Sequence, residues 1–525
     1  MAKLYLDESI LKYKKQGYYP FHMPGHKGIS LNFSNPWGLD ITEIDGFDNL
    51  HHAKGIILDA QKRAATLFGA QHSYYLVNGS TCGLLSAISG AIPWGGKFLM
   101  ARNSHKSVYH AVYLRRLEPI YLMPSITNYG ILGSILPEHV ATTLKAHANR
   151  AGYTDIKAIL ITSPTYDGIV SDIRQIADIA HSYHIPLIVD EAHGAHFKFS
   201  TEFPKTALSC GADVVIQSLH KTLPSFTQTA LLHISSTLVD RAKIEHFLNI
   251  YQTSSPSYLF MAGMEQCIRI IESDGKLLFD TFTKRLHYFY NQCKQLLHLN
   301  VCMPSTLSKH ECFDRDFSKI LIAVGDASLT GQELYLTLLE KYKLQLEMVS
   351  GHYVVALSSI MDTEEGFMRL LSALLEIDKN NCPIARNRHP TATIEHRQAT
   401  TKMEYRQPIT EPAHAIAEPT YANTIMEPIP IIITNATLYT IPIKKLTISG
   451  AMEHPSHPVL LRESAGQVSQ EYIYLYPPGI PLLAPGEVIP SDLLSNLSVL
   501  SQQGISIEGL SDKSSQRINV VDASS

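Results

Sequence analysis

Hydrophobic positions along this chain follow two alternating patterns. Short apolar runs, such as those at residues 97–101, 158–162 and 187–190, are separated by longer segments in which apolar residues recur every three or four positions. The short runs predict buried strands and the longer segments predict helices, of which residues 55–68 and 173–183 are the clearest. Strands that alternate with helices in this way indicate an α/β fold, with a mostly parallel sheet covered by helices on both faces.

Changes in this pattern divide the chain into five segments. The alternation fills a large unit at residues 36–305, which follows an N-terminal arm of short helix and loop at residues 1–35. A small α+β unit is predicted at residues 306–379. Its elements are a strand at 319–324, a helix at 330–342, a strand at 353–358 and a helix at 363–377. Residues 380–427 are rich in Pro, Thr, His, Ala and Glu with little periodicity, which predicts an irregular linker before a C-terminal domain at residues 428–525.

Charge and composition narrow the classes of function. The chain has 525 residues, which corresponds to about three domains and is ample for a large buried core. Its formal net charge of −4 gives no basic footprint for nucleic acid or for an anionic membrane. Seven cysteines without a C-x-x-C pair predict free thiols in a reducing compartment. The N-terminus lacks an apolar signal core and no apolar run is long enough to span a bilayer, so we expect a cytoplasmic protein.

Two residues that follow predicted strands carry the candidate chemistry of the large unit. The apolar run at residues 187–190 ends at Asp190, and a second run at residues 214–216 leads to Lys221. A carboxylate beneath a ring nitrogen and a lysine that forms a Schiff base are the protein groups that pyridoxal phosphate chemistry most needs. Taken singly, Asp190 is equally explained as a turn cap and Lys221 as a solvated surface lysine.

A third element is typical of a phosphate site. An apolar strand end at residues 76–77 is followed by the tight Asn78-Gly79 turn, and then by Ser80 and Thr81 at the start of a predicted helix. Backbone N–H groups at a helix start, with hydroxyl groups beside them, bind phosphate, although a glycine turn before a helix is also common without a ligand. In open α/β sheets ligands lie beyond the carboxyl ends of the strands, where Asp190 and this turn are both expected.

Eight short segments of the chain match, in the same order, motifs of one enzyme family. They are residues 21–28 (FHMPGHKG), 42–52 (TEIDGFDNLHH), 78–81 (NGST), 102–107 (RNSHKS), 163–168 (SPTYDG), 190–196 (DEAHGAH), 218–221 (SLHK) and 476–487 (YPPGIPLLAPGE). In these segments the chain resembles the Orn/Lys/Arg decarboxylase family, and most of all its compact form, which lacks the receiver-like N-terminal wing of the larger members. The resemblance implies pyridoxal 5'-phosphate as cofactor and the aspartate aminotransferase fold, with a seven-stranded-type sheet in the large domain.

This resemblance assigns a role to each candidate site residue. Lys221 would carry the cofactor, Asp190 would keep its ring nitrogen protonated, and His105 would stack on the ring face. The phosphate would be held by Ser80, Thr81, Ser218 and His220. His193 would donate to the phenolic oxygen, although the larger members have tryptophan at the matching place. Ser254, in the segment TSSPSY, would reach the phosphate of a neighbouring subunit in a homodimer or a higher homo-oligomer.

A basic substrate also needs an acidic partner for its distal cation. Glu43, Asp45 and Asp48 form the densest acidic cluster near a motif and are the candidates, although a charged loop is more often only solvated. The adjacent histidines His51 and His52 lack a carboxylate or cysteine partner at ligand spacing, so no metal site is expected.

Three functions are compatible with these residues. The full set of motifs favours decarboxylation of arginine, lysine or ornithine to agmatine, cadaverine or putrescine, with arginine slightly preferred. A second possibility is another reaction on the same fold, such as amino transfer or acyl transfer, because fold and cofactor motifs do not fix which bond breaks. A strong arginine clamp on the α-carboxylate would favour amino transfer, and the sequence does not locate one. The third is a non-catalytic paralogue, against which the intact Asp190 and Lys221 argue.

Overall fold

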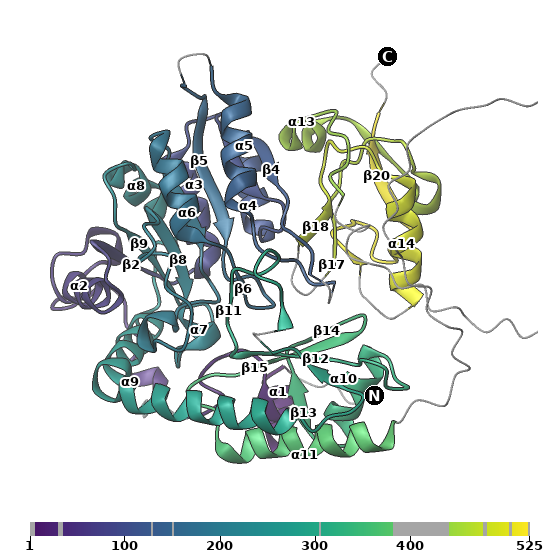
Figure 1. The fold of residues 1–525 in the computed structure, drawn as a ribbon. Coiled ribbons are helices and arrows are strands. Elements are labelled where there is room, and N and C mark those ends of the chain that lie inside the picture. Colours follow the sequence, from purple (N-terminus) through teal and green to yellow (C-terminus); the bar gives the residue numbers. More distant parts are fainter. Residues whose placement is uncertain are drawn as a thin grey trace, which may run out of the picture.

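The structure of the protein is a computed structural model that describes most of the chain. The described ranges are residues 6–29, 35–127, 130–149, 152–303, 306–381, 440–475, 480–502 and 507–522. Apart from its first two positions, the predicted linker lies outside the described residues, as do residues 476–479 of the last family segment. Figure 1 shows the large α/β unit above a smaller unit that contains β12, α10 and α11, with the C-terminal unit beside them.

The large unit is built on a seven-stranded sheet with the order β2-β9-β8-β7-β5-β3-β4. Its strands are β2 His72–Leu76, β3 Lys97–Ala101, β4 Glu118–Leu122, β5 Ile156–Thr162, β7 Leu187–Asp190, β8 Val214–Ser218 and β9 Ala230–Ile234. Neighbours are parallel except that β9 runs antiparallel to both β2 and β8. The strands β7, β8 and β9 are buried at every position, which explains their nearly continuous apolar sequences. The predicted fold class is confirmed.

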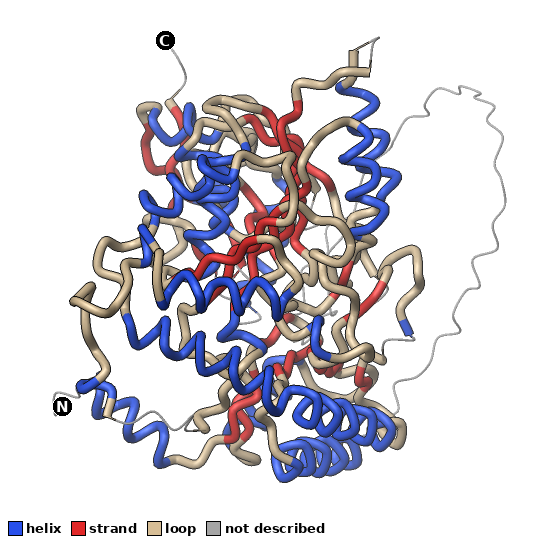
Figure 2. Tube along the Cα trace, turned by 90° about the vertical axis from the view of Figure 1, so that its left-hand side faces the viewer, coloured by secondary structure: helices blue, strands red, loops and turns tan. Residues whose placement is uncertain are grey.

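Helices cover both faces of this sheet, as the strands in the centre of Figure 2 and their flanking helices show. On one face lie α3 Gly79–Ala91, α4 Lys106–Leu114 and α8 Arg241–Tyr251, and on the other lie α5 Pro137–His147 and α6 Ile173–Ser182. Met100 of β3 packs on the first face and its neighbour Leu99 on the second, because successive strand residues point to opposite faces. The helix predicted at residues 55–68 is present as α2 Ile56–Phe68.

The small unit follows the long helix α9 Tyr258–Cys293 and contains a four-stranded antiparallel sheet of order β10-β12-β15-β14. Its strands are β10 Asn300–Val301, β12 Lys319–Ala323, β14 Met348–Ser350 and β15 Tyr353–Leu357, and its helices are α10 Gly331–Glu340 and α11 Glu364–Asn380. All four elements predicted here are therefore confirmed. A short pair of strands, β6 Ile169–Val170 and β11 Asp314–Arg315, joins this unit to the large one.

The N-terminal arm packs on the small unit. It contains α1 Leu6–Lys15 and β1 Tyr19–Phe21, and β1 pairs in parallel with β13 Leu344–Leu346. Lys27 fixes the end of the arm, because its ammonium group donates to Leu357 O at 2.7 Å and lies 3.6 Å from an Asp362 carboxylate oxygen. The arm thus carries the segment 21–28 towards the carboxyl edge of the large sheet.

In the described residues of the C-terminal unit there are two small antiparallel sheets and two α-helices. Its elements are α13 Ile448–Glu453, β16 Ser456–Leu460, β17 Ile473–Leu475, β18 Ile480–Leu483, α14 Ser491–Gln502, β19 Ile507–Glu508 and β20 Arg517–Val521. β16 pairs with β20, and β17 lies between β18 and β19. A buried ion pair between Arg102 and Glu487 connects this unit to the end of β3. The five domain limits drawn from the sequence stay predictions.

Candidate active site

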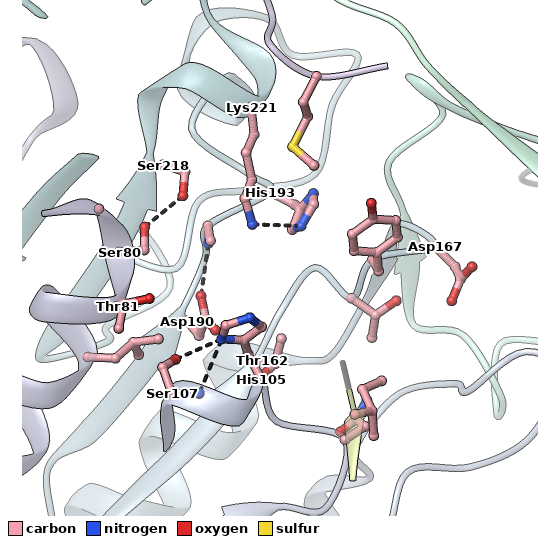
Figure 3. Close-up of a pocket in the computed structure, with 18 of the residues that line it drawn as sticks. Ser80, Thr81, His105, Ser107, Thr162, Asp167, Asp190, His193, Ser218 and Lys221 are labelled. Atoms are coloured by element: carbon pink, nitrogen blue, oxygen red, sulfur yellow. Dashed lines mark hydrogen bonds between the residues drawn. The ribbon is translucent and has the colours of Figure 1, made fainter. Parts of the chain in front are cut away.

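A cavity of about 290 Å³ lies at the carboxyl ends of the strands of the large sheet. Of the predicted site residues, those that line it are Ser80, Thr81, His105, Asp190, His193, Ser218, His220 and Lys221. They come from segments as far apart in sequence as the start of α3 and the turn after β8. Asp190 and Lys221, whose common location was the central expectation, therefore share one cavity (Figure 3). Ser254 does not line it and is exposed.

Lys221 is placed by the single helical turn α7 Leu219–Thr222, which follows β8 directly. Its amine nitrogen lies 3.0 Å from Nε2 of His193, as the dashed line in Figure 3 shows. Burial lowers the pKa of Lys221, and the negative charges of Asp190 and Glu347 oppose this effect. Because the pKa is lowered, the neutral amine is more populated than in an ordinary lysine.

Asp190 is the last residue of β7 and is only 4% exposed. Its carboxylate accepts a hydrogen bond of 3.2 Å from the backbone N–H of Ala192. Burial raises the pKa of Asp190, and the Lys221 amine acts in the opposite direction. A carboxylate in this environment is suited to bind a cationic group, because a positive partner would restore its ionised form.

Hydroxyl groups gather where α3 begins. The Oγ atoms of Ser80 and Ser218 are 2.7 Å apart, and Gly79 starts the helix with a φ of +74°, which favours glycine. The Asn78 side chain makes no capping bond to α3; its oxygen accepts from Thr253 N at 3.2 Å instead. Backbone N–H groups at the start of α3 are thus left for an anion, which the helix dipole also attracts.

Two buried polar atoms of the cavity wall have no hydrogen-bond partner among the described residues. They are Oγ1 of Thr162, at the end of β5, and Oδ1 of Asn103, in the turn after β3. An unpaired buried polar atom costs about 1–3 kcal/mol, so such atoms usually have a ligand or water as partner. Their location indicates that the cavity accommodates a polar ligand.

The histidines of the cavity are held neutral. Burial, helped by the charge of Lys221, lowers the pKa of His105 to about 3, and burial lowers that of His220 to about 4. Nδ1 of His105 contacts Ser107 Oγ at 2.8 Å at the start of α4, and Nδ1 of His220 contacts Thr229 O at 2.9 Å. His105 therefore presents a flat, uncharged ring to the cavity.

Two ionisable residues beside this cavity were missed by the sequence analysis, and both belong to the small unit. Nζ of Lys319, the first residue of β12, lies 2.9 Å from Nδ1 of His193. Glu347, between β13 and β14, accepts hydrogen bonds from the Tyr166 hydroxyl and, at 2.9 Å, from the backbone N–H of Met23. The apolar pattern around Lys319 and Glu347 gives no signal that either residue belongs to a functional site. Asp167, in the segment 163–168, also lines the cavity and accepts a hydrogen bond of 3.0 Å from the Tyr353 hydroxyl.

The acidic cluster proposed for the distal cation lies elsewhere. The Asp48 carboxylate accepts hydrogen bonds from backbone N–H groups around the start of α2, at 2.6 Å from Gly55 and 3.2 Å from Ile57. Glu43 and Asp45 are exposed. None of the three lines the cavity of this chain, so its geometry does not support their predicted role.

Other site classes have no counterpart in the part of the chain that the structure describes. No described group of three or more His, Cys, Asp or Glu side chains is arranged to bind a metal ion. The six described cysteines are free and buried. Among the described helices, none combines the length and the apolar character needed to cross a membrane.

Comparisons with known proteins agree with the arrangement of these residues. The family model of the Orn/Lys/Arg decarboxylase major domain matches residues 5–319, and that of the C-terminal domain matches residues 445–512. The chain belongs to the Orn/Lys/Arg decarboxylase family. It is therefore an enzyme of a decarboxylase family, and the predicted resemblance is confirmed.

Relatives within this family differ in the basic amino acid that their names specify. An arginine decarboxylase of Bacillus anthracis is 28% identical over 525 residues, which cover 98% of this chain and 97% of the relative. A constitutive lysine decarboxylase of Escherichia coli is 25% identical over 94% of this chain and 76% of its own. A crystal structure of a lysine decarboxylase from Francisella novicida has a TM-score of 0.71 at 20% identity, and covers 91% of this chain and 73% of its own. That similarity supports the fold.

Proposed function

We propose that this enzyme removes the α-carboxyl group of a basic amino acid as carbon dioxide, with pyridoxal phosphate as cofactor and arginine as the first candidate substrate. The observation that carries the proposal is the meeting of the Asp190 carboxylate and the Lys221 amine in one cavity, next to the start of α3. Arginine is placed first because the relative of matching length named above is an arginine decarboxylase, whereas the chain covers 76% of the lysine decarboxylase.

The residues of the cavity fit pyridoxal phosphate group by group. The N-terminus of α3 and the hydroxyls around it suit a phosphate, Asp190 suits a protonated ring nitrogen, and Lys221 suits covalent attachment. The unpaired atoms of Thr162 and Asn103 leave polar positions for the ring substituents. When bound, the cofactor supplies an electron-poor ring that takes up the electrons freed as the carboxyl group leaves. The residues that would hold the phosphate are Ser80, Thr81, Ser218 and His220.

The protein side of the chemistry follows from protonation states. Asp190 would keep a proton on the ring nitrogen, because a buried carboxylate strongly favours an opposite charge beside it. Lys221 would supply a neutral amine, which its lowered pKa favours. His105 would fix the plane of the ring with a face that carries no charge, and His193 would contact the phenolic oxygen.

The distal cation of the substrate needs a carboxylate that the cavity can offer. We propose Glu347 and Asp167 for this role in place of the exposed acidic cluster. Asp167 lines the cavity. Glu347 lies just behind the wall, where it accepts hydrogen bonds from the Tyr166 hydroxyl and the Met23 N–H group. A planar guanidinium group can bind two such carboxylates at once, whereas an ammonium group acts as a point charge.

The cavity wall formed by the described residues has no arginine clamp, which supports decarboxylation over amino transfer. No arginine lines the cavity among the described residues. Arg102, which lies in the family segment 102–107, instead donates two hydrogen bonds of 2.9 Å to Glu487. An α-carboxylate that is not clamped in the ring plane is free to stand perpendicular to it, which is the orientation that decarboxylation requires.

We further propose a cytoplasmic homodimer or higher homo-oligomer in which Ser254 reaches the phosphate site of the neighbouring subunit. Ser254 is exposed and follows Thr253, whose backbone N–H donates to Asn78 at the start of α3. This location is near the phosphate end of the cavity but outside it. A Ser254→Ala variant is expected to bind the cofactor more weakly by equilibrium dialysis, and an unchanged affinity would exclude this role.

The proposed function is tested by following the cofactor and carbon dioxide separately. The purified chain with added pyridoxal phosphate is expected to be yellow, and borohydride should fix the cofactor to Lys221, as peptide mass spectrometry would show. Carbon dioxide release should be measured with arginine, lysine and ornithine. Lys221→Ala should abolish both signals, whereas Lys243→Ala, at an exposed lysine of α8, should abolish neither. A colourless protein that takes up no cofactor would contradict the proposal.

A further inference from the structure

His193 connects two lysines that come from different units of the molecule. Its Nε2 lies 3.0 Å from Nζ of Lys221, and its Nδ1 lies 2.9 Å from Nζ of Lys319. His193 is 6% exposed and Lys319 is 1% exposed. The ring of Tyr166 packs edge-on against the imidazole, with centroids 4.9 Å apart, which fixes its orientation. The imidazole of His193 thus links the two lysines in an ordered arrangement, with Lys319 buried and Lys221 at the cavity.

The hydrogen-bonding capacity of the His193 imidazole restricts the charges that Lys221 and Lys319 can carry at the same time. Burial and the cations around it hold the pKa of His193 well below its usual value, so the ring is neutral near pH 7. A neutral imidazole has one N–H donor and one acceptor nitrogen. The N–H group needs a lone pair to donate to, which an ammonium group lacks and a neutral amine has. Both hydrogen bonds therefore form only when one lysine is a neutral amine and the other is the donor.

We propose that Lys221 and Lys319 share a single proton through His193, so that Lys319 is a positioning residue that readies the Lys221 amine for covalent attachment of the cofactor. In one state Lys221 is the ammonium group and donates to Nε2, while the Nδ1–H group donates to neutral Lys319. A proton passes from Lys221 to Nε2 as another passes from Nδ1 to Lys319. Lys221 is then neutral, Lys319 carries the charge, the ring is the other neutral tautomer, and the number of protons is unchanged.

The groups around the two amines make one shared proton more favourable than two. Lys221 faces the carboxylates of Asp190 and Glu347, with the neutral rings of His105 and His220 beside it. Lys319 faces Asp316, Glu347 and Asp167, and Lys27 is a further cation near it. Burial lowers the pKa of Lys319 to about 8; Asp316 opposes this effect, and repulsion from Lys221 adds to it. Two buried amines this close therefore titrate as a coupled pair.

The test measures the protonation of Lys221 in the full-length chain after bound cofactor has been removed with a carbonyl reagent. Lys221 lines the cavity, so a small acylating reagent can reach it. Trace labelling with acetic anhydride across pH 6–11, read by mass spectrometry of the Lys221 peptide, gives the fraction of neutral amine. A shared proton predicts two steps of labelling about one pH unit or more apart. The exposed Lys276 of α9 provides the reference amine in the same sample.

Two substitutions at Lys319 should change this profile in opposite ways. Lys319→Met removes the second site for the proton, so Lys221 should lose the lower step and titrate in a single upper step. Lys319→Arg keeps a donor that cannot release its proton, so Nε2 should always carry hydrogen and Lys221 should keep only the lower step. A purely structural role for Lys319 would not produce this opposite pair of results.

Two labelling results would count against the proposal, one in the wild-type chain and one in a variant. A single labelling step for wild-type Lys221 near pH 10.4, the value of an ordinary lysine, would overturn the proposal. So would a two-step profile that Lys319→Met leaves unchanged. Lys243→Met is the matched control and should retain both steps. The role of the Lys221 amine in attaching the cofactor rests on the proposed function, whereas the labelling experiment does not depend on it. If two labelling steps are present but no carbon dioxide is released, only the proposed function is rejected.

Discussion

Burial is the main cause of the pKa shifts of the ionisable side chains in the cavity. The cavity contains a carboxylate, Asp190, whose pKa is raised by burial, and a lysine, Lys221, whose pKa is lowered by it. Both shifts favour the neutral form, which costs less in a poorly solvated site. A cationic ligand beside Asp190 would reverse the first shift. Burial alone therefore prepares Asp190 to bind a cationic ligand and Lys221 to react as a neutral amine.

Removing the charge of Asp190 should separate cofactor binding from turnover. We expect Asp190→Asn to retain cofactor that borohydride can fix to Lys221, because the phosphate contacts are intact. Carbon dioxide release should fall by about a hundredfold or more, since a preorganised charge at the reacting ring is lost. Asp178→Asn, at an exposed position of α6, serves as the control. A normal rate in Asp190→Asn would remove the role assigned to this carboxylate.

A buried histidine outside the cavity should make stability depend on pH. His233 in β9 is fully buried between Ser73 and Gln217, and burial lowers its pKa to about 3. The unfolded chain binds a proton near pH 6.5 that the folded chain does not, so stability present above pH 6.5 is lost as the pH falls.

At pH 5 the expected loss from His233 is about 2 kcal/mol in the free energy of unfolding. Urea titrations at pH 7 and pH 5 measure it, and His233→Gln should show a smaller difference between the two pH values by this amount. His246→Gln, at an exposed position of α8, should keep the wild-type difference. Equal pH dependence in wild type and His233→Gln would contradict the assignment.

At the scale of single elements, the sequence predicted well wherever local pattern sets the structure. The helix at 173–183 and the strands that end at Thr162 and Asp190 lie where periodicity indicated. Local pattern was a poorer guide to acidic residues. Asp48 was a candidate for substrate binding, but its carboxylate accepts hydrogen bonds from backbone N–H groups at the start of α2. Sequence separation hides this contact, because Asp48 lies eight positions before Ile56, the first residue of α2.

Substitution of Asp48 should therefore affect stability and not substrate binding. Asp48→Ala is expected to lower the free energy of unfolding by about 1–2 kcal/mol, as loss of a helix cap does. Asp48→Asn should lose less, because its amide oxygen can still accept hydrogen bonds. The KM for the substrate should stay unchanged in both. Asp45→Ala is the control at an exposed neighbour, and a raised KM in Asp48→Ala alone would restore the substrate-binding hypothesis.

On the scale of the whole molecule, three units converge on the cavity. The large unit provides Asp190 and Lys221, and Ile480 of the C-terminal unit also lines the cavity. The small unit places Lys319 and Glu347 behind the wall, against His193 and Met23. The C-terminal unit is fastened by Glu487, whose carboxylate forms a two-bond ion pair with Arg102. Arg102 is in the turn that leads to His105, so this contact also supports the cavity.

Breaking this ion pair from one side should be costly. Arg102 and Glu487 are both 2% exposed, so Glu487→Ala leaves a buried charge without its partner. We expect a loss of about 3–5 kcal/mol in the free energy of unfolding, measured by urea titration. The double variant Arg102→Met with Glu487→Met should recover much of that loss, because no charge remains buried. A double variant as unstable as Glu487→Ala would show that packing, not charge, dominates this contact.

The sequence by itself determined the α/β fold, the ends of several strands and eight of the polar residues that line the cavity. These features depend on local pattern, or on motifs in which polar residues directly follow buried strands. Only the tertiary structure decided that Lys319 meets His193, 126 positions away, and that Glu487 meets Arg102, 385 positions away. Such contacts arise when separately formed units pack together. The packing of the units decides which residues meet, and this leaves no periodicity or motif spacing in the sequence from which the contacts could be predicted.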